Sequence, residues 1–263
     1  INQMYEFEGV QVFLDDNEEV LYNWADIICT HLDYSKKAMW KAAEKNKPLF
    51  HFTHNDTPYP SILNYVGNVK VVHNAQWVAD SLNYNLPSII FPPVVDESYK
   101  AEDKGRKYIT LVNLNDNKGA RYFYSLVKKL PQYQFLGVRG SYDGQQIESH
   151  PNLTIWPNTP DARKIYEVSK LVLMPSHYES WGRVASEAMY NGIPVICNPT
   201  EGLKENVSHG GLLIPRKETE RWKDEIVKLM EDEKYYKGWS KKALKRAKEL
   251  APKWEELEKF LLS

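Results

Sequence analysis

Cysteine is scarce in this sequence, and the usual targeting signatures are absent. Only two cysteines, Cys29 and Cys197, occur among 263 residues, which excludes a disulfide scaffold and a Cys-rich zinc site and fits a reducing compartment. No apolar run reaches the ~18 residues of a membrane span, and residues 1–4 lack the basic and apolar regions of a signal peptide. We therefore expect a cytoplasmic chain without a membrane-spanning segment, with peripheral membrane contact left open. The first residue is Ile rather than Met, which leaves open whether residues precede it.

An excess of charge of one sign is also lacking. The chain holds 34 Lys and Arg against 35 Asp and Glu, and this balance argues against a dedicated nucleic-acid binder. Residues 1–100 hold 7 Lys and Arg against 13 Asp and Glu, a net charge of −6, whereas residues 101–263 hold the other 27 against 22, a net charge of +5. The uneven split suggests two lobes.

Motifs for common cofactors and metals are missing as well. No G-x-G-x-x-G or Walker loop follows a predicted strand, which argues against NAD and ATP sites. The seven histidines show no H-E-x-x-H or similar spacing, and no D-x-D carboxylate pair is present. We interpret Asp15-Asp16 as turn residues and expect neither a metal ion nor a resident cofactor.

The sequence does contain short apolar runs that alternate with helical segments. This alternation is typical of βαβ units, whose parallel strands are buried on both faces. We predict strands at residues 10–13, 26–30, 48–52, 69–73, 88–91, 108–112, 134–138, 153–156, 171–174, 194–197 and 211–214. We predict helices at residues 35–46, 76–83, 118–130, 161–168 and 183–190, and only helices after residue 218. The expected fold class is therefore α/β.

A break in this pattern marks a domain boundary. Pro92-Pro93 and a charged run up to Gly105 interrupt the alternation, which restarts with an apolar strand at residue 108. We accordingly place a first lobe at residues 1–96, a linker at 97–107, a second lobe at 108–250 and a C-terminal helix at 251–263.

The most informative stretch, residues 174–196, reads MPSHYESWGRVASEAMYNGIPVI. A strand ends at Pro175, a polar loop carries Glu179, and Gly182 opens a helix that contains Glu187. Ligands of parallel α/β sheets bind beyond the carboxyl ends of strands, and a helix N-terminus favours an anionic or hydroxyl-rich ligand. The carboxylate of Glu179 can accept hydrogen bonds from the hydroxyls of a sugar, and that of Glu187 from the diol of a ribose.

The spacing of Glu179 and Glu187 resembles the E-x7-E signature of retaining GT4-like glycosyltransferases, which have the GT-B fold. The preceding Pro-Ser, the internal glycine, and the Glu-Ala-Met and Gly-Ile-Pro-Val-Ile that follow add to the resemblance. It covers residue 108 to the C-terminus well and residues 26–107 more faintly. It implies two Rossmann-like lobes facing each other across a cleft. The first lobe is expected to be reduced or incomplete, because the family's opening glycine-rich loop is not in this sequence.

The resemblance also implies roles for single residues. Lys118 corresponds to the lysine that neutralises the donor diphosphate, Glu179 to the carboxylate that contacts the donor sugar, and Glu187 to the one that binds the ribose. Nucleotide binding is further expected of Asn158 and Thr159. The other expected donor-site residues are Gly182, Arg183, Val184, Asn113, Arg139 and Gly202.

Two of these positions depart from the family pattern. Asn113 stands where the family usually has an arginine, so Arg139 or Arg183 would have to substitute for that cation. Residues 200–205 resemble the family's loop that borders the donor, but Glu201-Gly202 stand where the family usually has a pair of glycines. In the first lobe, His54 resembles a histidine of the acceptor side and has His51 as the second candidate. The alternative interpretation of either histidine is an ordinary structural residue at the end of a strand.

The function implied is transfer of a hexosyl group, with retention, from a nucleotide-diphosphate sugar to an acceptor hydroxyl. UDP is the expected nucleotide by analogy, and the acceptor is a glycan, a lipid or another hydroxyl compound. Two alternatives stay open, namely a non-catalytic sugar-nucleotide-binding module and an epimerase or phosphorylase-like enzyme of the same architecture.

Overall fold

Two parallel β-sheets organise the chain. The computed structural model describes residues 4–7, 9–13, 18–32, 35–58, 67–141 and 144–263. The chain divides into two compact units, one made of Ile1–Phe91 with Trp254–Ser263 and the other of Pro92–Lys253. The Asp15-Asp16 pair, expected to form a turn, lies outside the described residues.

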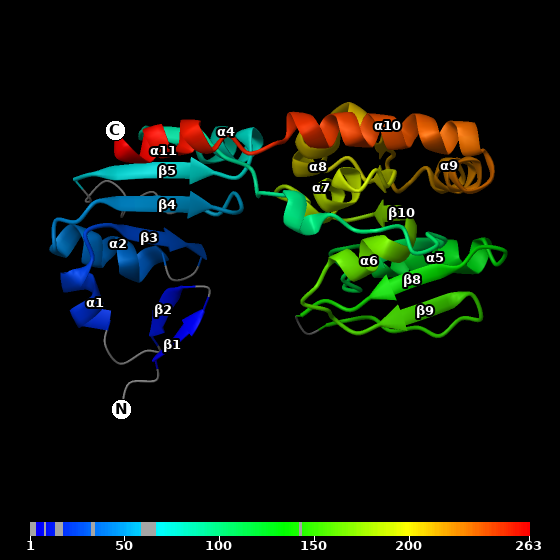
Figure 1. Cartoon of the computed structure of the whole chain (residues 1–263), viewed down its shortest axis with the longest axis horizontal. Helices are drawn as coiled ribbons and strands as arrows, with labels where there is room; N and C mark the ends of the chain where they lie inside the picture. The colour runs from blue at the N-terminus through cyan, green and yellow to red at the C-terminus, as the bar shows by residue number, and fades with distance from the viewer. Residues whose placement is uncertain (1–3, 8, 14–17, 33–34, 59–66, 142–143) are drawn as a thin grey trace. The chain divides into compact units, whose positions relative to one another are not determined.

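The first unit is built on a four-stranded parallel sheet in the order β3-β4-β5-β6 (Figure 1). Its strands are β3 (Ile28–His31), β4 (Leu49–Thr53), β5 (Val69–His73) and β6 (Ser88–Ile90), and its first helices are α1 (Glu18–Trp24), α2 (Ser35–Glu44) and α4 (Gln76–Leu82). Met39 and Ala42 of α2 are fully buried in one cluster with Leu49 and Val71. An antiparallel hairpin, β1 (Met4–Phe7) and β2 (Val10–Phe13), precedes this sheet.

The last helix, α11 (Trp254–Leu262), also belongs to the first unit. The Nζ atom of Lys70 in β5 donates to the carbonyl oxygens of Phe260 at 2.8 Å and Leu261 at 3.1 Å. A lysine in this place satisfies carbonyls that the helix end leaves without partners. The ring of Trp254 lies 5.2 Å from that of Phe91. These contacts hold the end of the chain against the first sheet.

The second unit contains a six-stranded, all-parallel sheet in the order β12-β11-β10-β7-β8-β9. The strands are β7 (Tyr108–Val112), β8 (Phe135–Val138), β9 (Leu153–Trp156), β10 (Ser169–Met174), β11 (Val195–Cys197) and β12 (Leu212–Leu213). Their apolar runs are continuous because helices cover both faces of the sheet.

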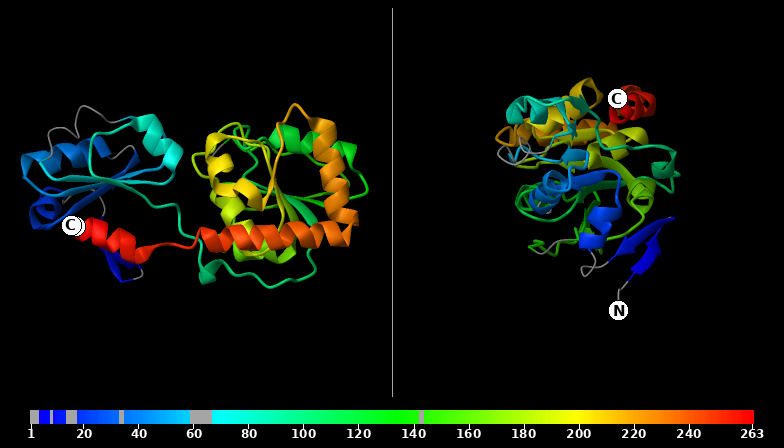
Figure 2. Two further views of the ribbon diagram at one scale, coloured as in Figure 1. Left: turned by 90° about the horizontal axis from the view of Figure 1, so that it is seen from above. Right: turned by 90° about the vertical axis from the view of Figure 1, so that its left-hand side faces the viewer.

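Two layers of helices enclose this second sheet. The helices of the unit are η2 (Glu97–Tyr99), α5 (Ala120–Lys129), α6 (Arg163–Val168), α7 (Arg183–Tyr190), α8 (Glu201–Val207), η3 (Ser208–Gly210), α9 (Thr219–Glu231) and α10 (Glu233–Glu249). Phe123 of α5 and Trp222 of α9 are fully buried in one core, and Ala188 of α7 and Ala243 of α10 in another. Figure 2 shows α5 and α9 on one side of the sheet and α10 on the other.

The strand order of the second unit has one point of reversal. The chain lays down β7, β8 and β9 outward on one side and then returns to place β10, β11 and β12 on the other side of β7. The segments that follow β7 and β10 therefore leave neighbouring strands at the same edge of the sheet. Crevices of open α/β sheets bind ligands at such reversal points.

The predicted α/β fold with parallel sheets is confirmed, and one local prediction is wrong. The strands and helices expected between residues 108 and 190 are present, although the helix expected from Lys118 begins at Ala120. Residues 200–205 are not a loop, because Glu201–Val207 forms α8. Thr200 caps this helix, with its Oγ1 atom accepting from the amide of Leu203 at 3.4 Å. The sequence reasoning also missed β1 and α1.

Candidate functional site

An ion pair lies at the reversal point of the second sheet. The Nζ atom of Lys118, from the segment after β7, is 2.8 Å from Oε1 of Glu179, from the segment after β10. Only 9% of the Glu179 side chain and 28% of the Lys118 side chain are exposed. The Oγ atom of Ser176 donates to the same Oε1 atom at 2.9 Å. The largely buried carboxylate is thus balanced by one ammonium group and one hydroxyl.

The backbones of the two segments touch. Gly119, the N-cap of α5, has φ +83°, and a Cβ atom there would lie 2.4 Å from the carbonyl oxygen of Pro175. The amide of His177 donates to the carbonyl of Asn117 at 2.7 Å. Only glycine fits at position 119, because any other residue would strain the backbone at this positive φ and its Cβ atom would clash with Pro175. The close approach brings Lys118 within reach of Glu179.

A side chain also shapes the loop that carries the lysine. The Oδ1 atom of Asn115 accepts from the amide of Lys118 at 2.9 Å, which is the local turn that asparagine commonly forms. The loop enters α5 directly after this turn, because the amide of Ala120 donates to the carbonyl of Asn115. The position of Lys118 is therefore set by its own loop as well as by Glu179.

Helix α8 packs against the other side of the segment that carries Glu179. A Cβ atom on Gly202 would lie 2.4 Å from the carbonyl oxygens of both Glu179 and Ser180. Gly202 therefore lies beside the expected donor site. It is a residue of α8, and because it has no side chain, the helix can pack directly against the backbone of Glu179 and Ser180. Gly182, with φ +84°, opens α7 and is closed in by the side chain of Leu203.

Asn206 of α8 locks the start of α7, and sequence reasoning missed it. Its Nδ2 atom donates to the carbonyls of Trp181 and Gly182, both at 3.0 Å, and its Oδ1 atom accepts from Ser186 at 3.0 Å. Asn206 is fully buried. A single asparagine within a short helix carries no sequence signal for this role.

The second carboxylate, Glu187, is held inside α7. The hydroxyl of Tyr166 donates to Oε2 at 2.6 Å, and the Nε atom of Arg183 lies 2.8 Å from Oε1. Burial raises the pKa of Glu187, an effect that the bonds from Tyr166 and Arg183 oppose. The Arg183 guanidinium also lies over the ring of Tyr99, 5.0 Å from its centroid. Tyr99 and Tyr166 were not predicted.

The remaining expected donor-site residues have varied surroundings. Asn113 adopts φ 72°, and its backbone amide donates to the carbonyl of Val138 at 2.8 Å, which joins the ends of β7 and β8. Its Oδ1 atom accepts from Nε2 of Gln145 at 2.8 Å. Arg139 and Asn158 are exposed at the carboxyl ends of β8 and β9. Thr159 caps the turn before α6, because its Oγ1 atom accepts from the amide of Asp161 at 3.2 Å. Val184 is half-buried in the first turn of α7.

His54 lies in the first unit, directly after β4. Its ring is 5.2 Å from that of His31 in an edge-to-face arrangement, and burial together with His31 lowers its pKa. The second candidate, His51, is buried within β4, where burial and the neighbouring His73 lower its pKa to about 4. Both imidazoles are therefore neutral at pH 7.

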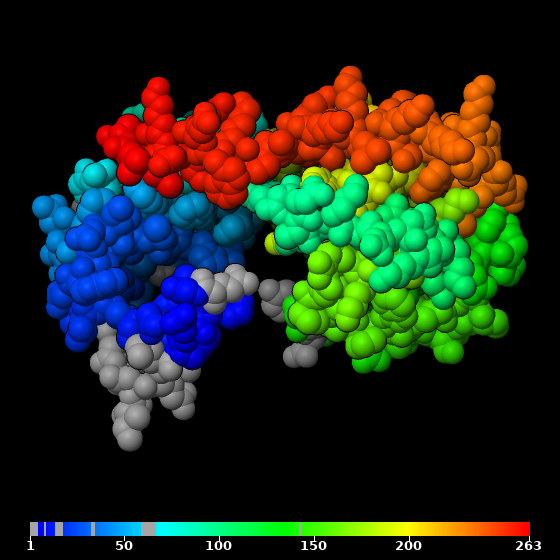
Figure 3. Space-filling view, viewed as in Figure 1, coloured from blue at the N-terminus to red at the C-terminus, as the bar shows by residue number. Residues whose placement is uncertain are grey.

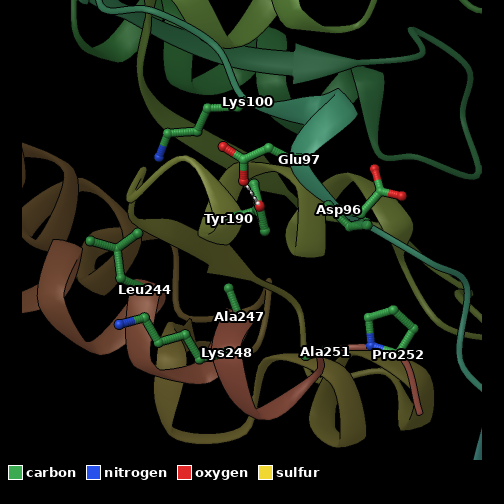
Figure 4. Close-up of a pocket in the computed structure, with 10 residues that line it drawn as sticks. Asp96, Glu97, Lys100, Tyr190, Leu244, Ala247, Lys248, Ala251 and Pro252 are labelled. Carbon is green, nitrogen blue, oxygen red and sulfur yellow. Dashed lines mark hydrogen bonds between the residues drawn. The ribbon is translucent and has the colours of Figure 1, made fainter. Parts of the chain in front are cut away.

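A cavity of about 380 Å³ lies elsewhere on the second unit. It is bounded by the segment around η2, the end of α7 and the last turns of α10. Figure 3 shows the segment around η2 directly beside α10. The hydroxyl of Tyr190 donates to Glu97 at 2.5 Å. Figure 4 shows these two side chains on one wall of the cavity, with Leu244 and Ala247 on the opposite wall. None of the expected site residues lines this cavity.

Among the described residues, no helix has the length and apolarity that a membrane crossing requires.

Fold and sequence together define the class of protein. Residues 95–246, more than half of the chain, match the family described as Glycosyl transferases group 1. The chain therefore belongs to the glycosyl transferases group 1 family.

Curated relatives match only a short segment. The D-inositol 3-phosphate glycosyltransferase of Segniliparus rotundus is 41% identical over 83 residues, which cover 30% of this chain and 18% of that protein. The protein of the same name from Corynebacterium urealyticum is 38% identical over 71 residues, 26% of this chain and 17% of that protein. The matched segment thus spans less than a fifth of either relative.

Solved structures resemble the chain over most of its length. HepE of Anabaena, in complex with UDP and glucose, superimposes with a TM-score of 0.77 at 18% identity, over 93% of this chain and 79% of that chain. Sucrose-phosphate synthase from Thermosynechococcus elongatus gives a TM-score of 0.72 at 17% identity, over 90% and 72%. These likenesses support the GT-B-like fold.

Proposed function

We propose that the chain carries the donor site of a retaining, metal-independent GT4-like glycosyltransferase. The enzyme would move a hexosyl group from a nucleotide-diphosphate sugar, with UDP as the expected nucleotide, to an acceptor hydroxyl. The observation that carries this proposal is the Lys118–Glu179 pair at the reversal point of the second sheet, 2.8 Å from nitrogen to oxygen. A cation for phosphate and a carboxylate for sugar hydroxyls stand there side by side.

The leaving diphosphate needs positive charge that is already in place. The ammonium of Lys118 and the start of α7 at Gly182 supply it, since helix N-termini favour anions. Preorganised donors of this kind stabilise charge that grows in the transition state. Asn113 cannot replace the arginine of the family as a cation, so we assign that supporting role to Arg139, whose side chain is exposed at the end of β8.

Glu179 and Glu187 would bind neutral groups of the donor. Glu179 would accept from the hydroxyls of the hexose, and Glu187 from the ribose diol, with Asn158 and Thr159 beside the base. The Nε atom of Arg183 lies 2.8 Å from Oε1 of Glu187, so ribose would have to share that carboxylate with the guanidinium. No carboxylate acts as a nucleophile in the proposed front-face reaction, in which the leaving phosphate takes the acceptor proton. His54, as a neutral imidazole, would serve the acceptor side.

UDP as the nucleotide is supported by the fold neighbour HepE, which is described in complex with UDP and glucose. The curated relatives that match residues of this chain are named as glycosyltransferases that act on D-inositol 3-phosphate. A polyol phosphate is therefore one acceptor to include in assays.

The decisive experiment combines calorimetry with product analysis. We expect the chain to bind UDP-glucose and to release UDP while forming an α-linked product from an acceptor panel. Binding without turnover would instead identify a sugar-nucleotide-binding module, which the missing arginine at position 113 favours. Conversion of the sugar while it stays attached to UDP would identify an epimerase. No binding of any nucleotide sugar would overturn the proposal.

A further inference from the structure

A second, smaller cavity adjoins the Lys118–Glu179 site on the α5 side of the sheet. Its volume is about 240 Å³, and it lies between the start of α5, the segment after β10 and the residues that precede α9. It is lined by Asp116, Gly119, Arg121, Tyr122, His177 and Arg216. Neither Lys118 nor Glu179 lines it, so it is distinct from the proposed donor site.

Arg216 supplies the unusual charge of this cavity. Its guanidinium nitrogens lie 2.6 Å and 2.7 Å from the Nε2 and Nδ1 atoms of His177. A guanidinium has only donors, and a neutral imidazole has a single acceptor nitrogen, so at most one of these contacts is a hydrogen bond. Burial and the charge of Arg216 lower the pKa of His177, which keeps the imidazole neutral.

The charge of Arg216 is not balanced locally. Within the part of the chain that the structure describes, no carboxylate lies at ion-pairing distance from this guanidinium. The one carboxylate of the cavity, Asp116, is paired with Arg121, whose NH2 nitrogen is 3.1 Å from Oδ2. The cavity therefore carries a net charge of +1 from these side chains, and the positive end of α5 at Gly119 adds to it.

Arg216 is also placed by the framework of the donor site. The Oδ1 atom of Asn198 accepts from the amide of Arg216 at 3.2 Å, while its Nδ2 atom donates to the carbonyl of Ser176 at 2.8 Å. Ser176 in turn donates to Glu179. The arginine is thus fixed to the segment that holds the sugar-binding carboxylate, and the cavity has a defined position beside it.

We propose that this cavity binds a compact oxyanion, namely the phosphate group of a phosphorylated substrate. Arg216 offers two parallel N–H donors, which is the arrangement that phosphate oxygens accept best, and the anion would displace the imidazole of His177 as its partner. Arg121 is the second cation within the cavity. That the phosphate belongs to the acceptor rests on the proposed transferase function, whereas the anion site itself does not.

Inorganic phosphate titrated calorimetrically into the whole chain, at constant ionic strength, tests the proposal. We expect millimolar binding that weakens about tenfold or more in Arg216→Gln, because a charged hydrogen-bonding partner is lost. Arg216→Lys should recover part of the affinity. The matched control is Arg221→Gln on α9, since Arg221 pairs with Glu218 at 3.0 Å and does not line the cavity.

Two further arms separate this site from the donor site. Lys118→Ala should lose UDP-glucose binding but keep phosphate binding, and glucose 6-phosphate should compete with phosphate where glucose does not. Unchanged phosphate binding in Arg216→Gln, its loss in Lys118→Ala, or no competition by glucose 6-phosphate would overturn the proposed site. Phosphate binding without any UDP-glucose binding would leave this site standing and refute the transferase.

Discussion

The ammonium of Lys118 and the carboxylate of Glu179 lie 2.8 Å apart, although 61 residues separate them in the chain. Each charge has its counter-charge within the protein, so neither is left alone in a largely buried place. A donor that enters must share this pair, with the diphosphate next to the lysine and the sugar next to the carboxylate. Binding would then be an exchange of partners within a preformed site.

Breaking this pair should affect both stability and turnover. Lys118→Ala leaves the 9% exposed Glu179 with the hydroxyl of Ser176, and we expect the free energy of unfolding to fall by about 1–3 kcal/mol. Transfer should fall by ~10²–10³ because a preorganised donor is lost. Urea denaturation and initial rates with UDP-glucose measure the two effects.

The control for this prediction is Lys204→Ala. Lys204 pairs with Glu201 on the surface of α8, where both side chains are about half exposed, so stability and rate should hardly change. Equal rates in Lys118→Ala and the wild type would remove Lys118 from the proposed reaction.

The close contact of the two loops predicts a sharp difference between two glycines. Gly119 and Gly105 share φ +83°, but a Cβ atom meets the Pro175 carbonyl oxygen only at position 119. Gly105→Ala should cost about 1–2 kcal/mol of backbone strain, and Gly119→Ala a further 1–3 kcal/mol. Denaturation midpoints measure both, and calorimetry should show weaker UDP-glucose binding only in Gly119→Ala. Indistinguishable variants would contradict the close approach described here.

Glu187 is expected to lower the stability of the fold at pH 7 while it contributes to UDP binding. Burial raises its pKa, so its contribution to stability is full below the pKa of the unfolded chain and is lost as the pH rises through the folded value. At pH 7, above the pKa of the unfolded carboxyl, burial of Glu187 therefore lowers the free energy of unfolding. Glu187→Gln should be as stable as the wild type or more stable at pH 7, while UDP affinity falls about 10–100-fold. A variant that loses stability but keeps UDP affinity would assign Glu187 a purely structural role.

The histidines of the first unit predict a loss of stability in mild acid. The pKa of His51 falls from 6.5 to about 4, so its neutral form supports folding fully above pH 6.5 and progressively less toward pH 4. The full difference corresponds to about 3 kcal/mol. His51→Gln should flatten the dependence of the urea midpoint on pH between 7 and 4.5, leaving the smaller effects of His54 and His73. A pH dependence in His51→Gln as steep as that of the wild type would contradict this assignment.

Local patterns predicted most of the fold, because they depend on neighbours in the chain. The apolar run at residues 108–112 became β7, and the helix expected at 183–190 begins and ends where predicted. The loop expected at 200–205 was wrong because the cap at Thr200 was not recognised. Helix α1 was missed because it is only seven residues long and contains no buried residue.

The site was predictable as a set of residues but not as a set of contacts. The motif from Glu179 to Glu187 is contiguous in sequence, so its residues could be named in advance. The bonds from Tyr166 to Glu187 and from Asn206 to Gly182 join positions more than 20 residues apart. Arg216 is 39 residues from His177 and lies outside the stretch of residues 174–196. Such pairs are brought together only by the strand order of the sheet.

The same strand order ties the completion of the sheet to the assembly of its chemistry. A chain that has formed only β7, β8 and β9 exposes one edge of β7, with unpaired amides and carbonyls that invite aggregation. During synthesis this edge stays open until residues 169–174 emerge and pair as β10. Pairing of β10 with β7 covers this edge and also places Glu179 next to Lys118. The same folding step therefore protects the edge from misassembly and forms the ligand site.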